Sequence, residues 1–337
     1  MSRKIAAAAF FPIAITMASG SFASTVDAVS FLTASHGFSI DGAAPGASPA
    51  GIVASVSGPT IDRTIESAVD DPDAVNITQN DVQIGNASSS PPIPFTYDIQ
   101  DRTNRTDPTE FADARVSGSI TSTQDEGDDI VNFALATRDV TREGLAQVRI
   151  TSDPVAAAAT SAYGLSRTNS YENVTDAPIT FTIEGYFDAF LLSRYSGGDG
   201  FARAATSWDI LFSGHTAGNL TYIPLDTFFT SFDEIGTGGF ADANLVSQPS
   251  GVEGISLTAA TSALGSGGFT EASATAEHDF LFRLTVDPGQ TVDMAYGFSQ
   301  VSVVEFDVDP AVVPLPASAV LLFGALGGLF ALRRRRA

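Results

Sequence analysis

Clustered carboxylates are the residues of this 337-residue chain whose types and spacing best suit chemistry. Calcium takes several oxygen ligands from flexible loops, and two short stretches each supply several carboxylates. One stretch surrounds Pro72, and the other is the acidic turn 125–129. Neither matches an EF-hand loop, because position 75 is Val and no glutamate follows at the required spacing. The calcium candidates are therefore Asp70, Asp71, Asp73, Asp125, Asp128 and Asp129, and the alternative is that both clusters are solvated turns of an acidic protein.

Other catalytic signatures are missing from the sequence. His36, His215 and His278 lie far apart and lack the spacing of metal ligands, so we expect packed or solvated side chains. The chain contains no cysteine, which excludes disulfides and thiolate metal sites. A carboxylate pair for glycoside hydrolysis forms through folding, so sequence spacing cannot detect it. We therefore expect no enzyme activity and no cofactor other than calcium, with a secreted polysaccharide-active hydrolase as the alternative.

Alternation of apolar and polar residues predicts the β-strands that would position these groups. In 179–187, 280–286 and 304–308, every second residue is apolar, which is typical of a strand with one buried face. Glycine-rich turns separate such runs. Trp208 shares one side of its predicted strand with Ile210 and Phe212, which favours a core position over carbohydrate stacking. The sequence predicts an all-β ectodomain with a β-sandwich or jelly-roll-like fold.

One helix is also predicted, between the two groups of strands. Asp153 is placed to cap it, Pro154 to occupy its first position and Gly164 to end it, although the same stretch also suits a linker. The Pro/Ser-rich stretches 41–59 and 86–94 predict flexible connections. One large sandwich with an irregular N-terminal part, or two smaller β units that meet near residue 160, are both compatible with this pattern.

The charge of the chain is concentrated between its two ends. Six of the 17 basic residues lie in the terminal segments, which leaves 11 Arg against 39 acidic residues and a net charge of −28. A field this negative repels nucleic acid and anionic lipid, so neither is expected as a partner.

The N-terminus has the pattern of a secretory signal peptide. Arg3 and Lys4 form a positive n-region, 5–17 is apolar, and Ser21-Phe22-Ala23 resembles a signal peptidase site. We expect cleavage between Ala23 and Ser24.

The C-terminus combines a proline-rich motif, an apolar segment and a cationic end. The apolar run 317–332 carries no charge and, with the residues before it, is long enough to span a thin bilayer. An arginine block after such a segment stays cytoplasmic, so the ectodomain is expected outside. The tail resembles the VPLPA variant of the PEP-CTERM sorting signal, which implies processing by an exosortase-type membrane peptidase. The residues that carry the resemblance are Val313, Pro314, Leu315, Pro316, Ala317, Arg333, Arg334, Arg335 and Arg336.

These observations predict a chain of four parts: a signal peptide (1–23), an irregular β region (24–160), a β-sandwich region (161–310) that either stands alone or joins 24–160, and a sorting signal with a transmembrane helix (311–337). We expect an exported structural or adhesive protein of the cell surface or extracellular matrix, membrane-anchored until its tail is processed. The resemblance further implies exopolysaccharide as a partner. A carbohydrate-binding module without turnover is a further alternative.

Overall fold

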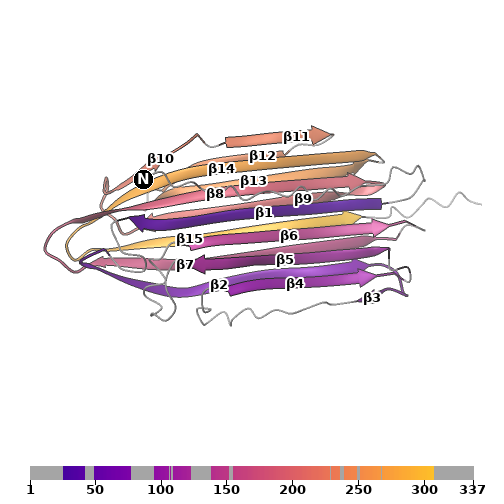
Figure 1. Ribbon diagram of the computed structural model, residues 1–337, viewed down its shortest axis with the longest axis horizontal. Coiled ribbons are helices and arrows are strands. Elements are labelled where there is room, and N and C mark those ends of the chain that lie inside the picture. The colour runs from indigo at the N-terminus through magenta and orange to yellow at the C-terminus, as the bar shows by residue number, and fades with distance from the viewer. Residues whose placement is uncertain are drawn as a thin grey trace, which may run out of the picture.

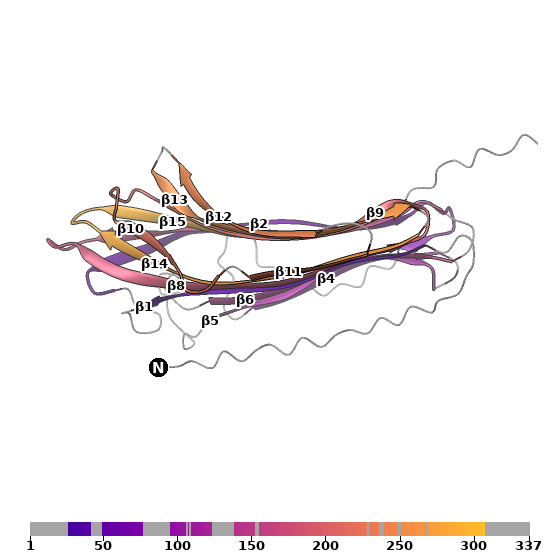
Figure 2. The ribbon, with the colours of Figure 1, turned by 90° about the horizontal axis from the view of Figure 1, so that it is seen from above.

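The structure is a computed structural model, and its described part is all-β. It describes residues 26–41, 49–76, 95–105, 107, 109–122, 138–151, 155–227, 229–235, 239–248, 251–266 and 268–306. Fifteen strands lie within these ranges, and all of their pairings are antiparallel. They form two sheets that pack face to face, which confirms the predicted β-sandwich at the level of architecture (Figures 1 and 2).

Sheet A contains nine strands over the described ranges. Their order is β10 (Leu220–Pro224), β14 (Phe269–Val286), β8 (Ile179–Ser196), β1 (Val26–Asp41), β6 (Arg138–Ile150), β5 (Phe111–Ser122), β4 (Phe95–Asn104) and β3 (Val75–Asn76), and β11 (Phe229–Ile235) also pairs with β14. In sheet B the described strands are β12 (Gly239–Gln248), β13 (Val252–Ser266), β9 (Asp199–Ser213), β15 (Thr291–Phe306), β7 (Ala157–Asn173) and β2 (Ile52–Val69), in that order.

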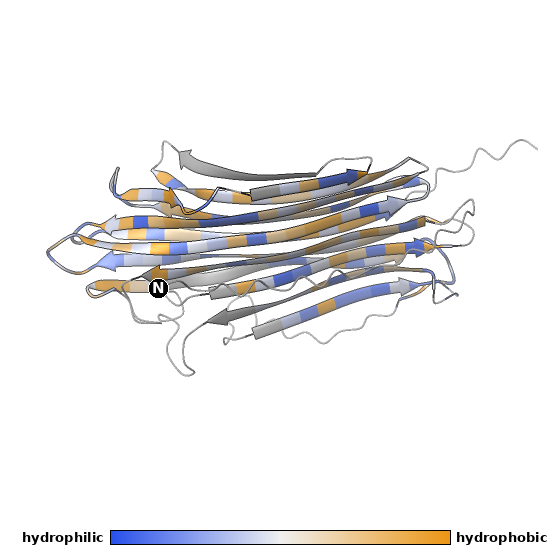
Figure 3. Ribbon diagram, turned by 45° about the horizontal axis from the view of Figure 1, so that its top comes forward, coloured by the Kyte–Doolittle hydropathy of each residue, from blue (hydrophilic) through white to orange (hydrophobic). Residues whose placement is uncertain are grey.

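The strands are long, and their side chains alternate between the core and the outside. β8 and β14 each have 18 residues, which corresponds to roughly 60 Å of extended chain. Along β14 every even-numbered residue from 270 to 286 is buried, and Figure 3 shows the matching alternation of apolar and polar residues. The alternation predicted for 179–187 and 280–286 is confirmed in β8 and β14.

Between the sheets the core changes character along the strands. One cluster of buried residues contains most of the large rings, including Trp208, which is fully buried as predicted. The other cluster is rich in alanine and lies toward the end of the sandwich at which the chain turns from β8 to β9. Small side chains allow the sheets to approach closely there, and Figure 2 shows the two layers drawing together at that end.

The chain passes repeatedly from one sheet to the other. β7, β9, β13 and β15 belong to sheet B, whereas β8 and β14, which lie between them in the chain, belong to sheet A. The N-terminal strands take part in both sheets, because β1 lies between β8 and β6, and β2 pairs with β7. Strands from 24–160 and 161–310 are thus neighbours in each sheet.

Two predictions made from the sequence are wrong. The described part of the predicted helix, 155–164, is not helical: from Ala157 it belongs to β7, which is paired with β2 on one side and with β15 on the other. Sheet pairing on both edges satisfies the backbone and overrides the helix propensity of alanine. The predicted connection 41–59 also contains strand, because β2 begins at Ile52 and passes Pro59 with a register shift, which an edge strand tolerates.

Candidate functional site

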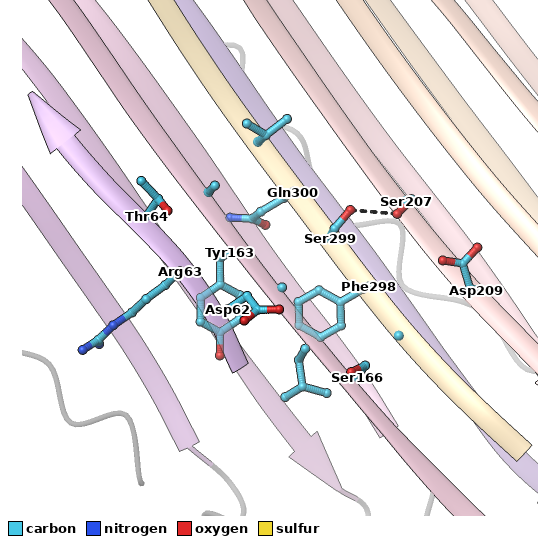
Figure 4. Close-up of a pocket in the computed structure, with 15 residues that line it drawn as sticks. Asp62, Arg63, Thr64, Tyr163, Ser166, Ser207, Asp209, Phe298, Ser299 and Gln300 are labelled. Carbon is cyan, nitrogen blue, oxygen red and sulfur yellow. Dashed lines mark hydrogen bonds between the residues drawn. The ribbon is translucent and has the colours of Figure 1, made fainter. Parts of the chain in front are cut away.

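A groove of about 440 Å³ lies on the outer face of sheet B (Figure 4). Strands β2, β7, β15 and β9 contribute to it. Its floor is low because Gly164 and Gly297 have no side chains where their strands run side by side. Ser207 and Ser299 form a hydrogen bond of 2.8 Å beside them. The surface of the groove is therefore mainly backbone and hydroxyl groups, which suits a ligand with many hydroxyl groups of its own.

Asp62 and Asp209 are carboxylates that line this groove at opposite sides. Asp62 is on β2, opposite Gly164 of β7. Asp209 is on β9, opposite Gly297 of β15. Because β7 and β15 are neighbours, three strand spacings separate Asp62 from Asp209. At about 4.8 Å per spacing, their backbones are about 14 Å apart across the strands. Ser207 is the residue of β9 in register with Asp62, and Asp209 lies two residues further along that strand, so the full separation of the two backbones is roughly 16 Å. The paired carboxylates of glycosidases are about 5–9.5 Å apart. The groove therefore has the features of a binding surface without the acid–base pair of a glycosidase.

A second group of carboxylates lies on the outer face of sheet A. Asp188 on β8 is directly opposite Glu277 on β14, and Ser35 on β1 is its neighbour on the other side. Burial raises the pKa of Asp188 to about 6, repulsion by Glu277 and Asp279 adds to the rise, and a hydrogen bond from Ser35 opposes it. Carboxylates with perturbed pKa values are a recognised signal of functional sites.

Asp188 and Glu277 are directly opposed, with Cβ atoms about 5 Å apart, so two carboxylates lie close together, as glycoside hydrolysis requires. The groove described above lies on the other outer face of the sandwich, on sheet B. The pair and the groove are thus separated by both sheets. They cannot act on one sugar chain together.

Next to this pair, a histidine is hydrogen-bonded at both ring nitrogens. His278 is buried on β14, its Nδ1 lies 2.9 Å from Asp226 Oδ1, and its Nε2 lies 2.5 Å from Tyr222 Oη. The arrangement resembles a catalytic triad with tyrosine in the place of the nucleophile. Burial raises the pKa of Tyr222 to about 12, and the charge of Asp226 contributes to the rise. The phenolate is therefore scarce at neutral pH, and we find no activated nucleophile here.

Of the described calcium candidates, Asp71 is engaged in the fold, whereas Asp70 and Asp73 are exposed. Asp71 forms an ion pair of 2.6 Å with Arg105 and accepts a hydrogen bond from the backbone NH of Asp73. Both interactions lower the pKa of Asp71. Within the residues that the structure describes, no three His, Cys, Asp or Glu side chains are grouped as a metal site requires. Asp125, Asp128 and Asp129 lie outside the described residues.

The three histidines have different surroundings. His36 is buried, with its ring centroid 4.6 Å from that of Trp208 and 5.1 Å from that of Phe298. Burial lowers the pKa of His36 well below its usual range, and the charge of Arg142 adds to this effect. His215 Nε2 lies 3.4 Å from a carboxylate oxygen of Glu253.

Both predicted targeting segments lie outside the described residues, which begin at 26 and end at 306. This applies to the cleavage site at Ala23 and Ser24, to the motif 313–317 and to the arginine block 333–336. No helix in the described part of the chain has the length and apolar character needed to cross a membrane.

Sequence reasoning missed Asp188, Glu277 and the contacts of His278. These residues are far apart in the chain, and only the register of β8, β14 and β10 brings them together. The acidic positions on the polar faces of β8 and β14 were visible as a pattern, but their pairing was not.

Comparison with known proteins adds no relationship: no family model, no curated protein and no solved structure matches this chain.

Proposed function

We propose that this protein is an exported structural or adhesive component of the cell surface or extracellular matrix. The observation that carries the proposal is the separation of the two candidate sites. The groove on sheet B is lined by Asp62 and Asp209, whose backbones are roughly 16 Å apart, and the closely spaced pair Asp188–Glu277 lies on the opposite face. Long antiparallel strands in two packed sheets suit a rigid spacer with large outer surfaces. Its acidic surface favours solubility and discourages nucleic acid and anionic membranes as partners.

Hydrolysis assays test the non-enzymatic part of this proposal. The purified exported protein should release no product from polysaccharide, peptide or ester substrates. Deleting its gene should reduce cell aggregation or matrix cohesion. Turnover that is lost in Asp188→Asn or Glu277→Gln, with folding retained, would replace the structural proposal with the hydrolase.

The proposed localisation rests on the terminal segments. A signal peptide cleaved after Ala23 would deliver the chain outside, and an exosortase-type peptidase would cut near Val313–Ala317. Mass spectrometry of mature surface protein should show Ser24 as the first residue and loss of Arg333–Arg336. Intact arginines on all mature molecules would leave an ordinary membrane anchor.

The groove supports a second candidate, a carbohydrate-binding module without turnover. Gly164 and Gly297 create the hollow, so a side chain at either position would fill it. Gly164→Leu is the test variant. A second glycine such as Gly218 is unsuitable as a control, because its positive φ of 87° would strain a leucine for reasons unrelated to the groove. Ala295→Leu, at an exposed outward position of the neighbouring strand β15, is the matched control. Loss of exopolysaccharide retention in Gly164→Leu alone would favour the binding module.

A further inference from the structure

A path of aromatic rings leads from the centre of the core to one edge of sheet A. It begins at Trp208, the only tryptophan of the chain, which is fully buried on β9. The centroid of the Trp208 ring lies 5.6 Å from that of Phe280 on β14. The Phe280 ring lies 6.2 Å from Tyr222 on β10 and 5.7 Å from His278. Trp208 and Tyr222 are therefore separated by a single intervening ring.

At the end of this path, Tyr222 has a base to receive its phenolic proton. Asp226 Oδ1 accepts hydrogen bonds from His278 Nδ1 and from the backbone NH of Asp279, at 2.9 and 3.0 Å. An ionised carboxylate only accepts hydrogen bonds, so in the neutral form of His278 the proton is on Nδ1 and Nε2 is the acceptor. Tyr222 Oη lies 2.5 Å from Nε2 and donates to it.

Three other oxidisable rings of the core, those of Trp208, Tyr163 and Tyr195, lack such a base. Trp208 Nε1 and Tyr163 Oη are buried without a hydrogen-bond partner in the described part of the chain. The hydroxyl of Tyr195 donates to the backbone carbonyl of Asp199, which is a very weak base. A phenol or indole that loses an electron becomes a strong acid, and an uncompensated positive charge is costly in a buried position. Among these four rings, a radical is therefore stabilised best at Tyr222.

We infer that Tyr222 is a redox-active tyrosine that reduces oxidised Trp208. The oxidant is a one-electron acceptor such as a peroxide-derived radical, which removes one electron from Trp208 and leaves the indole radical cation. One electron then passes from Tyr222 to Trp208, and the phenolic proton moves from Oη to His278 Nε2. The products are neutral Trp208, a neutral tyrosyl radical and an imidazolium paired with Asp226.

The cycle closes at the edge of the sandwich, where Tyr222 is half-buried. A soluble one-electron reductant supplies the electron that restores the phenol, and His278 returns the proton. Tyr222 thus gives the core a route for removing oxidising equivalents. This inference is independent of the proposed adhesive function.

Flash photoionisation of the purified protein tests the inference, because the single tryptophan gives an unambiguous starting radical. Transient absorption should show the Trp208 radical decaying as a tyrosyl radical appears. In Tyr222→Phe the tryptophan radical should live at least an order of magnitude longer, with no tyrosyl signal. Tyr195→Phe, which removes a buried tyrosine that lies in the alanine-rich cluster, should behave as the wild type.

The proton acceptor is tested separately. Asp226→Asn keeps an oxygen for the Asp279 NH but removes the charge that supports a protonated His278, so transfer should slow while the fold is retained. Transfer in the wild type should also slow in D₂O. The inference is overturned if the Trp208 radical decays in Tyr222→Phe at the wild-type rate, or if a tyrosyl radical still forms in that variant at another residue. It is also overturned if neither Asp226→Asn nor D₂O changes the rate of electron transfer.

Discussion

At the scale of single residues, the interior contains a charged side chain with few hydrogen-bond partners. Arg142 is fully buried, with its guanidinium carbon 4.5 Å from the centroid of the Phe298 ring. Its Nη2 donates to the backbone carbonyl of Ser207 at 3.2 Å, whereas Nε and Nη1 have no partner among the described residues. Burial lowers the pKa of Arg142 to about 9. A buried charge without an acidic partner is expensive.

Replacing Arg142 by methionine should therefore stabilise the protein. The variant removes two unsatisfied nitrogens and the buried charge, and a flexible apolar side chain fills much of the same space. We expect the free energy of unfolding to rise by about 1–2 kcal/mol in urea denaturation. Arg283→Met, at an exposed position of β14, should change it by less than about 0.5 kcal/mol. A loss of stability in Arg142→Met would show that the guanidinium has compensating interactions.

Asp188 should make the stability depend on pH. Its pKa is raised from 3.8 to about 6, so the native state holds the proton more tightly than the unfolded state does. The contribution of Asp188 to the free energy of unfolding therefore falls as the pH rises through this window. Asp188→Asn should remove that fall and be more stable than the wild type at pH 7, on the order of 1 kcal/mol after allowance for solvent screening of a half-buried group.

The measurement is the difference in unfolding free energy between Asp188→Asn and the wild type from pH 4 to pH 7. Proton binding by shared groups that do not interact with Asp188 cancels in this difference. His36 is one such group, because its lowered pKa gives the opposite slope in both proteins. Asp233→Asn, on the exposed strand β11, should show no such difference. If the difference in unfolding free energy between Asp188→Asn and the wild type did not change with pH, the Asp188 carboxyl would be in a solvent-like environment with an ordinary pKa.

At the scale of elements, period-two patterns with large apolar residues were sufficient to predict strands. β8 and β14 follow that pattern, with Phe187 and Phe280 buried. β7 was missed because its N-terminal half is built from alanine, whose small side chain suits both a helix and the thin part of a sandwich core. Pairing with β2 and β15 decides between them, and sequence-local reasoning does not include those partners.

Close approach of the sheets at the alanine-rich end should make Gly265 intolerant of a side chain. A Cβ there would lie 2.2 Å from Tyr195 Cε1 and 2.4 Å from the Gly198 carbonyl oxygen. We expect Gly265→Ala to lower the free energy of unfolding by about 1–3 kcal/mol through overpacking. Gly268→Ala, where a Cβ meets nothing within 4 Å, is the matched control and should be nearly neutral. Equal thermal stability of the two variants would contradict the packing.

At the scale of the whole molecule, the sequence determined the class of fold but not the sites. Gly164 and Gly297 form the groove floor, and Asp188 faces Glu277, only because particular strands are neighbours in a particular register. Antiparallel pairing of residues this far apart follows from the complete topology, in which the chain passes repeatedly between the sheets. Composition, in contrast, is a property of the whole chain and predicts bulk behaviour directly.

The net charge of −28 between the terminal segments should make thermal stability depend on ionic strength. Eleven arginines cannot neutralise 39 acidic residues, so carboxylates such as Asp188 and Glu277 repel one another in the native state. The Debye length falls from about 30 Å at 0.01 M to about 10 Å at 0.1 M, so added salt should raise the melting temperature by a few degrees. Sodium and potassium chloride should give equal shifts, because screening depends on ionic strength.

Calcium chloride at matched ionic strength separates screening from specific binding. A calcium site would add a rise in melting temperature that saturates and that magnesium chloride does not reproduce. The ion pair with Arg105 occupies Asp71, which leaves too few ligands for calcium around Pro72. We therefore expect Asp70→Asn and Asp73→Asn to leave the response of the melting temperature to calcium unchanged. Any additional rise should instead be lost in Asp128→Asn. A melting temperature that does not increase with sodium chloride would show that native-state repulsion does not limit stability, because screening can only weaken the repulsion between the carboxylates.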